Sequence, residues 1–281
     1  MTALLIFVGL LLLVSIWAAL ATYAFFWYEN SLSARLAPDR GRKLKLKLIS
    51  GLLSSILSVA IIIVTSPFGI FRRFWEPKEI LATKPAIILV HGLYHNPSAW
   101  LIFRNRLHKA GFKNIFIMHY RSFFTSFEDT IKKFEKFVAE ARQEVPDQPV
   151  FLIGHSLGGL LSRVYAERAQ GCAIPAAVIT LGSPHQGSKL AAFGLGKLAS
   201  SLLYRGPLFA EIESGHATLP CTGIAFFSPV DNMVLPSEAL RVPYQGWDYR
   251  ETVPVSHTSM LYSKSIAQKV IEILNGFPFT F

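Results

Sequence analysis

The sequence predicts an α/β fold, a mostly parallel sheet with helices on both faces, preceded by two transmembrane helices. After residue 85, short apolar runs alternate with segments of helical spacing, which is typical of a parallel sheet covered by helices. Ahead of this region, two long runs carry no charged side chain. The composition agrees, because 51% of the residues are hydrophobic and 16% are charged, against about 25% charged in an average chain. These values exclude a disordered chain, a collagen and a coiled coil.

The two uncharged runs are each long enough to cross a membrane. Residues 1–28 contain no charge, and we expect a first span at about 3–28. A second span is expected at about 48–66, before Pro67 interrupts it; crossing the hydrocarbon core takes about 20 apolar residues. A cleaved signal peptide is the alternative for the first run, but such a peptide begins with Lys or Arg. A buried core helix is the alternative for the second.

Basic side chains between the two spans predict the orientation. Positive loops stay in the cytoplasm, so the catalytic domain, expected at 76–281, would lie outside it, in the periplasm of a bacterium. The densest basic run lies in this loop, which explains much of the net charge of +10 without nucleic acid as a partner. The loop contains two acidic residues, Glu29 and Asp39, and six basic residues: Arg35, Arg40, Arg42, Lys43, Lys45 and Lys47.

The strands and helices of the expected sheet follow in order. Near-continuous apolar runs predict strands at 86–90, 114–119, 150–154, 176–181, 222–227 and 249–253. Helical spacing predicts helices at 97–110, 127–144, 157–170 and 263–274. An insert at 187–220, rich in Leu, Ala and Gly, fits either a core-packed helix pair or a lid that opens at a lipid surface.

The motif Gly154-His155-Ser156-Leu157-Gly158 stands between a predicted buried strand and a predicted helix. In a G-x-S-x-G turn the serine is strained and exposed above the sheet, and the glycines avoid collision with the helix that follows. We therefore expect Ser156 to be a nucleophile. The backbone N–H of Leu157, at the helix N-terminus, would stabilise a developing oxyanion.

An activated serine needs a base and an acid, which follow it in this order along the chain: serine, acid, histidine. Asp231 follows the run 222–227 at the end of a strand and is the expected acid, with Glu238 as the alternative. His257 follows the last predicted strand and is the expected base.

Two further histidines lie downstream of the serine. His185 comes before any candidate acid, so we interpret it as a hydrogen-bonded support near the site, and His216 lies in a polar loop. A second oxyanion donor is expected after the first strand, where His91 and Gly92 precede the N–H of Leu93.

Together these segments resemble the α/β-hydrolase lipases and esterases, particularly the bacterial triacylglycerol lipases. The resemblance covers about residues 85–275 and rests on His91-Gly92, residues 154–159, residues 181–188, the Asp231 segment and Ser256-His257. It implies ester hydrolysis through an acyl-serine intermediate, with Ser156, Asp231 and His257 as nucleophile, acid and base. No cofactor is expected, and no carboxylate pair matches the structural calcium of some members.

The resulting expectation is a membrane-anchored hydrolase of lipid esters whose partners are an acyl-ester substrate and the bilayer. A phospholipase, a thioesterase or a lipid-anchor deacylase would use the same residues, and a catalytically dead membrane scaffold is the alternative from another class. Acyl length, headgroup and oligomeric state stay open. Cys172 and Cys221 precede neighbouring predicted strands, so a disulfide is possible in an oxidising compartment.

Overall fold

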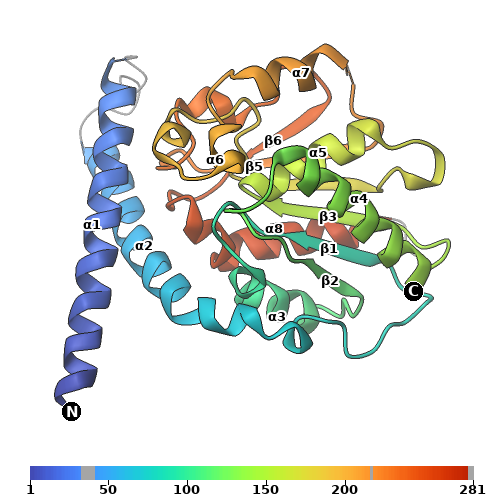
Figure 1. Cartoon of the computed structure of the whole chain (residues 1–281), viewed down its shortest axis with the longest axis horizontal. Coiled ribbons are helices and arrows are strands. Elements are labelled where there is room, and N and C mark those ends of the chain that lie inside the picture. Colours follow the sequence, from blue (N-terminus) through green and yellow to red (C-terminus); the bar gives the residue numbers. More distant parts are fainter. Residues whose placement is uncertain (33–41, 216–217, 278–281) are drawn as a thin grey trace.

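Six parallel strands form the centre of the molecule (Figure 1). The computed structural model describes residues 1–32, 42–215 and 218–277. Its strand order is β2-β1-β3-β4-β5-β6, and every neighbouring pair is parallel. The strands are β1 Ala86–Val90, β2 Ile115–Met118, β3 Val150–His155, β4 Ala177–Leu181, β5 Thr222–Phe227 and β6 Trp247–Glu251. The predicted α/β architecture is therefore confirmed.

Helices cover both faces of the sheet, as the apolar strands require. Within β1, Ile88 and Val90 pack into one core, whereas Ile87 and Leu89 pack into the other, because successive strand side chains point to opposite faces. Two helices cover each face: α4 Phe127–Glu144 and α5 Leu157–Arg168 on the first, α3 Leu101–Lys109 and α8 Lys264–Asn275 on the second.

The last strand is displaced from its predicted position. The sequence pattern predicted 249–253, whereas β6 spans Trp247–Glu251 and pairs with β5 from Trp247 onward. The buried Trp247 ring anchors the start of this edge strand against the first core. Because an edge strand exposes much of its length, its hydrophobic pattern locates it poorly.

One part of the insert at 187–220 packs in the core, and another part lines a cavity. The insert contains η6 Lys189–Phe193, α6 Lys197–Ser200 and α7 Pro207–Gly215. Leu198 and Phe209 are buried in the first core, as expected of a core-packed pair, whereas the η6 segment lines a cavity described below. Lid motion of the insert stays a prediction.

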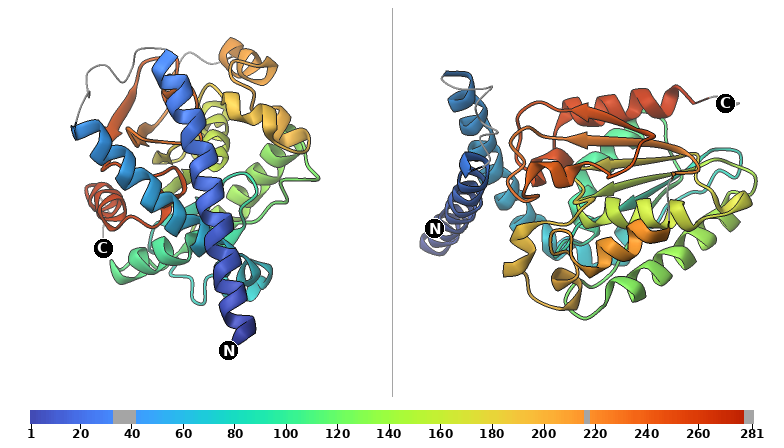
Figure 2. Two further views of the ribbon diagram at one scale, coloured as in Figure 1. Left: turned by 90° about the vertical axis from the view of Figure 1, so that its left-hand side faces the viewer. Right: turned by 90° about the horizontal axis from the view of Figure 1, so that it is seen from above.

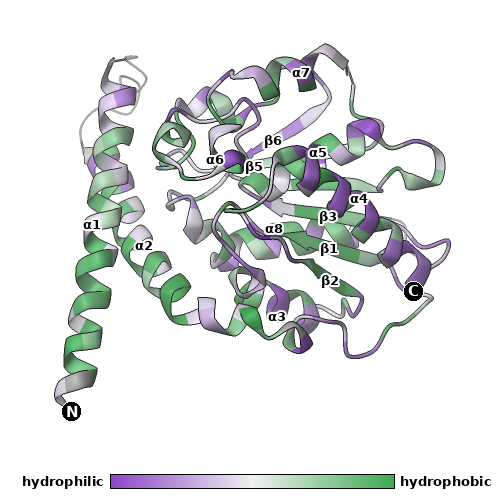
Figure 3. Ribbon diagram, in the orientation of Figure 1, coloured by the Kyte–Doolittle hydropathy of each residue, from purple (hydrophilic) through white to green (hydrophobic). Residues whose placement is uncertain are grey.

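Two long apolar helices precede the sheet domain, α1 Thr2–Leu32 and α2 Arg42–Thr65. Their candidate spans, Leu4–Ser31 and Lys43–Ile70, have mean hydropathies of 2.8 and 2.4 and are long enough to cross a membrane (Figure 3). Both helices lie across one side of the sheet domain (Figure 2). Arg35, Asp39 and Arg40 of the predicted basic loop lie outside the described residues.

Candidate active site

Ser156 occupies the turn between β3 and α5 with a strained backbone. Its φ is 54° and its ψ is −126°, a conformation that residues other than glycine rarely adopt. A Cβ on Gly154 would collide with the backbone of Gly158, and one on Gly158 would collide with the Val90 carbonyl. The two glycines therefore allow the helix to start directly beneath the serine, which is the geometry of a nucleophile elbow.

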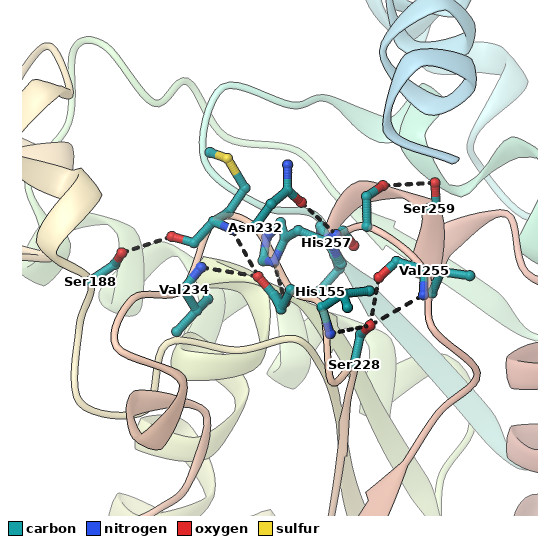
Figure 4. A network of polar contacts seen from close by, with 12 residues as sticks. His155, Ser188, Ser228, Asn232, Val234, Val255, His257 and Ser259 are labelled. Atoms are coloured by element: carbon teal, nitrogen blue, oxygen red, sulfur yellow. Dashed lines mark hydrogen bonds and ion pairs between the residues drawn. The ribbon is translucent and has the colours of Figure 1, made fainter. Parts of the chain in front are cut away.

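Asp231 and His257 form a buried pair at the ends of neighbouring segments. The Nδ1–H of His257 donates to Asp231 Oδ2 at 2.8 Å, and the Asp231 side chain is 1% exposed. The other carboxylate oxygen accepts the N–H groups of Met233 at 2.9 Å and Val234 at 3.0 Å (Figure 4). Held on both sides, the carboxylate fixes the imidazole tautomer in which Nε2 is available as a base.

Backbone contacts also hold His257. Its N–H donates to Asn232 Oδ1 at 3.0 Å, and its carbonyl accepts the Nε2–H of His155 at 3.1 Å (Figure 4). Asn232 is a site residue that the sequence reasoning missed. Its position directly after the expected acid was the only available signal.

Further hydrogen bonds join the acid loop to its surroundings. Ser228 Oγ donates to the Val255 carbonyl at 2.5 Å and accepts the Val255 N–H at 3.2 Å, which ties the acid loop to the loop that carries His257. Ser188 Oγ donates to the Met233 carbonyl at 2.7 Å, so the start of the insert is tied to the same loop (Figure 4).

Ser156 and His257 line one cavity of about 350 Å³, within the usual range for small-molecule sites. Among the described residues, no hydrogen bond joins Ser156 Oγ to the imidazole. Such bonds commonly tighten only when substrate binds. The structure thus brings together the predicted nucleophile and base, and the Asp231 carboxylate behind the base.

The expected oxyanion donors lie beside the serine. Leu157 is the first residue of α5, so its N–H is one of the helix-end donors without an intrahelical partner. Leu93 and Gly92 line the cavity with Ser156. A Cβ on Gly92 would come within 2.9 Å of Ser156 Cβ, so only glycine lets this loop approach the serine.

Gly182, directly after β4, is a second residue that the sequence reasoning did not assign. Its φ is +58°, and an added Cβ would lie 3.0 Å from Asp231 Oδ2 and 3.1 Å from His257 Nδ1. In the sequence, Gly182 contributes only to the resemblance that residues 181–188 carry. Glycine is required here by both the backbone conformation and the space that the acid–base pair occupies.

Buried histidines surround the site in their neutral form. Burial lowers the pKa of His91 to about 3 and that of His95 to about 4, and it lowers the pKa of His155 well below its usual value. The His91 ring stacks on Tyr120 with the centroids 4.2 Å apart, and the His95 ring stacks on His155. These rings therefore pack the site without adding positive charge near the base.

His185 supports the fold away from the cavity. It contacts Thr180 Oγ1 through Nε2 at 3.2 Å, and its carbonyl accepts a hydrogen bond from Arg163 at 2.9 Å. Its ring lies beside Trp247. It is hydrogen-bonded as expected, but to residues of β4 and α5, and it does not line the Ser156 cavity. His216, the other downstream histidine, lies outside the described residues.

The remaining candidates lie elsewhere. Glu238, the alternative acid, accepts a hydrogen bond from the Tyr204 hydroxyl at 2.6 Å. Cys172 and Cys221 are both free, the first exposed and the second half-buried. Within residues 1–32, 42–215 and 218–277, no group of three His, Cys, Asp or Glu side chains is placed to hold a metal ion.

The parallel sheet, the strained serine turn and the buried acid–base pair define an α/β-hydrolase fold. A family model described as "Alpha/beta hydrolase family" matches residues 87–267. The match covers more than half of the chain, which therefore belongs to this family. No curated protein matches the sequence.

Solved structures, two of them of lipases, share the fold. The mature lipase BlEst2 of Bacillus licheniformis is 19% identical with a TM-score of 0.57, over 70% of this chain and 94% of that one. Lipase B of Aspergillus fumigatus is 14% identical with a TM-score of 0.60, over 71% of this chain and 55% of that one. The lin2722 gene product of Listeria innocua is 15% identical with a TM-score of 0.53, over 70% of this chain and 96% of that one. At these identities the similarity concerns the fold.

Proposed function

We propose that the chain is a serine hydrolase that cleaves carboxylic esters of lipids through an acyl-serine intermediate. The observation that carries the proposal is the placement of Ser156 and His257 in one cavity, with the buried Asp231 carboxylate 2.8 Å from the imidazole. The family supports a hydrolase, and the lipase structures with the same fold favour an ester as substrate.

The proposed chemistry uses only side chains and peptide groups of this site. Ser156 Oγ attacks the ester carbonyl carbon while His257 Nε2 takes its proton, and Asp231 holds the imidazole in position. The N–H groups of Leu157 and Leu93 donate to the tetrahedral oxygen; losing one such donor costs roughly 10²–10³ in kcat. Collapse breaks the ester bond, and the leaving alcohol takes the proton from His257. A water molecule then attacks the acyl-serine while His257 takes its proton, and collapse releases the carboxylic acid and returns the proton to Ser156.

The cavity walls favour an apolar acyl group. Aliphatic and aromatic side chains line most of the cavity, among them Leu93, Phe193, Leu202 and Val234. Binding sites that are mostly apolar with a few placed polar groups fit acyl chains better than charged substrates. Hydrolysis of a graded series of acyl esters would define the preferred chain length. A phospholipase, a thioesterase or a lipid-anchor deacylase differs in the group that carries the acyl chain, so a second panel that varies this group at one chain length would separate them.

Replacement of the nucleophile tests the proposal. Ser156→Ala is expected to abolish short-chain ester hydrolysis and labelling by a fluorophosphonate probe. Ser162→Ala is the matched control, because the Ser162 hydroxyl donates to the Gly158 carbonyl within α5 and takes no part in the proposed chemistry. Wild-type activity in Ser156→Ala would refute the assignment. Absence of labelling in the folded wild type would instead favour the catalytically dead scaffold.

Membrane attachment through α1 and α2 is part of the proposal. The two helices are long and apolar enough to span a membrane. The sequence predicts two crossings with the catalytic domain outside the cytoplasm, in a bacterial periplasm; the attachment proposed for α1 and α2 does not depend on a full crossing. Protease treatment of intact cells tests the side on which the domain lies, since an outside domain would be digested and an inside domain protected.

A further inference from the structure

Helix α1 contacts the catalytic domain along its second half. Trp17 is its first residue to line the Ser156 cavity. Further along, the Tyr23 hydroxyl donates to the Val230 carbonyl at 2.9 Å, and the Lys189 ammonium pairs with Glu29 at 2.8 Å. The contacts therefore run along α1 from Trp17 onward.

Helix α2 contacts the loop 254–259, which carries the proposed base. Ser50 Oγ donates to a carbonyl of this loop at 2.8 Å. One turn later, Ser54 Oγ accepts the Ser256 N–H at 2.8 Å, and the Ser259 hydroxyl donates to the Ser54 carbonyl at 2.6 Å. The middle of α2 is therefore part of the packing around the site.

These contacts leave too little free helix for a crossing. The part of α1 ahead of Trp17, residues 2–16, is roughly 22 Å long at about 1.5 Å per residue, whereas the hydrocarbon core is about 30 Å thick. The part of α2 ahead of Ser50, residues 42–49, is shorter still. Full crossings would place the catalytic loops and the Lys189–Glu29 ion pair at the depth of the lipid chains, where exposed peptide and charged groups are strongly disfavoured.

The outward faces of the helices are apolar, and the domain continues the same surface. Side chains that point away from the domain include Leu13, Leu20, Trp27, Leu53 and Leu57, each between 51% and 66% exposed. Beside them lies an apolar rim of the domain. Its residues are joined by ring and hydrogen-bond contacts: Tyr94, Phe123, Phe124, Phe193 and Leu195. Phe193 in turn contacts Phe25 of α1 with the ring centroids 5.1 Å apart.

The rim and the outward faces of the helices form one continuous apolar surface. Phe124 is 84% exposed and Leu195 is 70% exposed, although both belong to the sheet domain and neither lies on a long apolar helix. Apolar patches of this kind mark sites of interaction on soluble domains. The exposed Lys43 and Lys45 at the start of α2 match the negative charge of lipid headgroups, which attract basic segments near a membrane surface.

We propose that α1 and α2 lie roughly parallel to the membrane plane within one leaflet, with the part of α1 ahead of Trp17, which is apolar and exposed on all sides, among the lipid chains. Because Ala18, Ala21 and Phe25 of α1 form one wall of the Ser156 cavity, this placement brings the cavity to the lipid. A lipid substrate reaches Ser156 from that leaflet along α1. This last step rests on the proposed ester hydrolysis; the position of the helices does not.

Cysteine labelling tests the position of the helices. In the full-length chain with Cys172→Ser and Cys221→Ser, Lys43→Cys and Lys264→Cys are introduced separately, and intact cells are treated with a membrane-impermeant maleimide. Lys43 begins α2 and Lys264 begins α8, and both are exposed. Helices on one leaflet place both positions on the same side, so both react or both react only after permeabilisation. Reaction of one position alone would show that α2 crosses the membrane and would overturn the inference.

A matched pair of alanines tests the route of the substrate. Ala21 lines the cavity, whereas Ala24, almost one turn later on α1, is exposed. The measured quantity is the rate on a long-chain ester in phosphatidylcholine vesicles divided by the rate on a soluble short-chain ester. Ala21→Phe is expected to lower this ratio about tenfold or more, as filling an apolar pocket does, and Ala24→Phe to leave it unchanged.

The outcomes separate this inference from the proposed function. Equal ratios for Ala21→Phe and Ala24→Phe would overturn the route along α1 while leaving ester hydrolysis in place. Loss of probe labelling in the wild type would overturn ester hydrolysis and leave the cysteine result to decide the position of the helices. Ala18→Leu replaces Ala21→Phe if the larger side chain prevents folding.

Discussion

Replacing Asp231 by asparagine separates the chemical role of the acid from its structural role. The carboxylate accepts one hydrogen bond from His257 at 2.8 Å and two from the N–H groups of Met233 and Val234 at 2.9 and 3.0 Å. The asparagine oxygen keeps the two peptide hydrogen bonds. Its amide nitrogen then faces the imidazole and donates to Nδ1. This holds the ring in the tautomer whose Nε2 carries a proton, so the ring accepts no proton from Ser156.

The expected cost falls on catalysis and much less on stability. Wrong-tautomer substitutions of this kind lower kcat by roughly 10⁴. Asp231→Ala would in addition leave the buried Val234 N–H without an acceptor, at a cost of about 1–3 kcal/mol of unfolding free energy, and the part-buried Met233 N–H at a smaller cost. We therefore expect Asp231→Asn to be inactive and nearly as stable as the wild type, and Asp231→Ala to be inactive and destabilised.

The assay is kcat/KM on a soluble short-chain ester, together with denaturant unfolding in detergent. Activity of Asp231→Asn within tenfold of the wild type would refute the assignment of the acid. Glu238→Gln is the matched control, because the Glu238 carboxylate accepts the Tyr204 hydroxyl and is expected to leave the rate unchanged.

Three further predictions concern the glycine, the neutral histidines and a buried ion pair. Gly182→Val is expected to abolish ester hydrolysis while the chain stays folded, because its Cβ would press on the acid–base pair; wild-type kcat would contradict this. Burial lowers the pKa of His91 to about 3 and of His95 to about 4. Below about pH 6.5 these two rings therefore bind protons in the unfolded chain while they stay neutral in the folded chain. Unfolding free energy measured against pH should then fall toward pH 4, by about 1.4 kcal/mol per pH unit for each ring; a flat profile would exclude this linkage. Arg163→Leu removes the partner of the buried Glu167, 2.7 Å away, and should destabilise the fold by about 3–5 kcal/mol in denaturant unfolding, with a loss below 1 kcal/mol counting against it.

The sequence by itself determined the sheet and the elbow. Apolar runs of strand length, helical spacing and the glycines around Ser156 are local signals, because each depends on residues within one strand or turn. For the same reason β6, an edge strand with a weak pattern, was placed two residues late. The order of serine, acid and histidine singled out Asp231 and His257, and the structure brings that pair to 2.8 Å.

Only the tertiary structure decided what surrounds Ser156, Asp231 and His257. Gly182 and Asn232 contact the acid–base pair through turns that no periodicity marks. Helix α1 forms one wall of the cavity, although it is far from the sheet domain in the sequence. Tyr23 and Val230, which are hydrogen-bonded, are separated by 207 positions. An apolar side chain in α1 has the same sequence signal whether it faces lipid, another helix or an acyl pocket. Its role is therefore set by the packing of distant segments, which hydropathy does not encode.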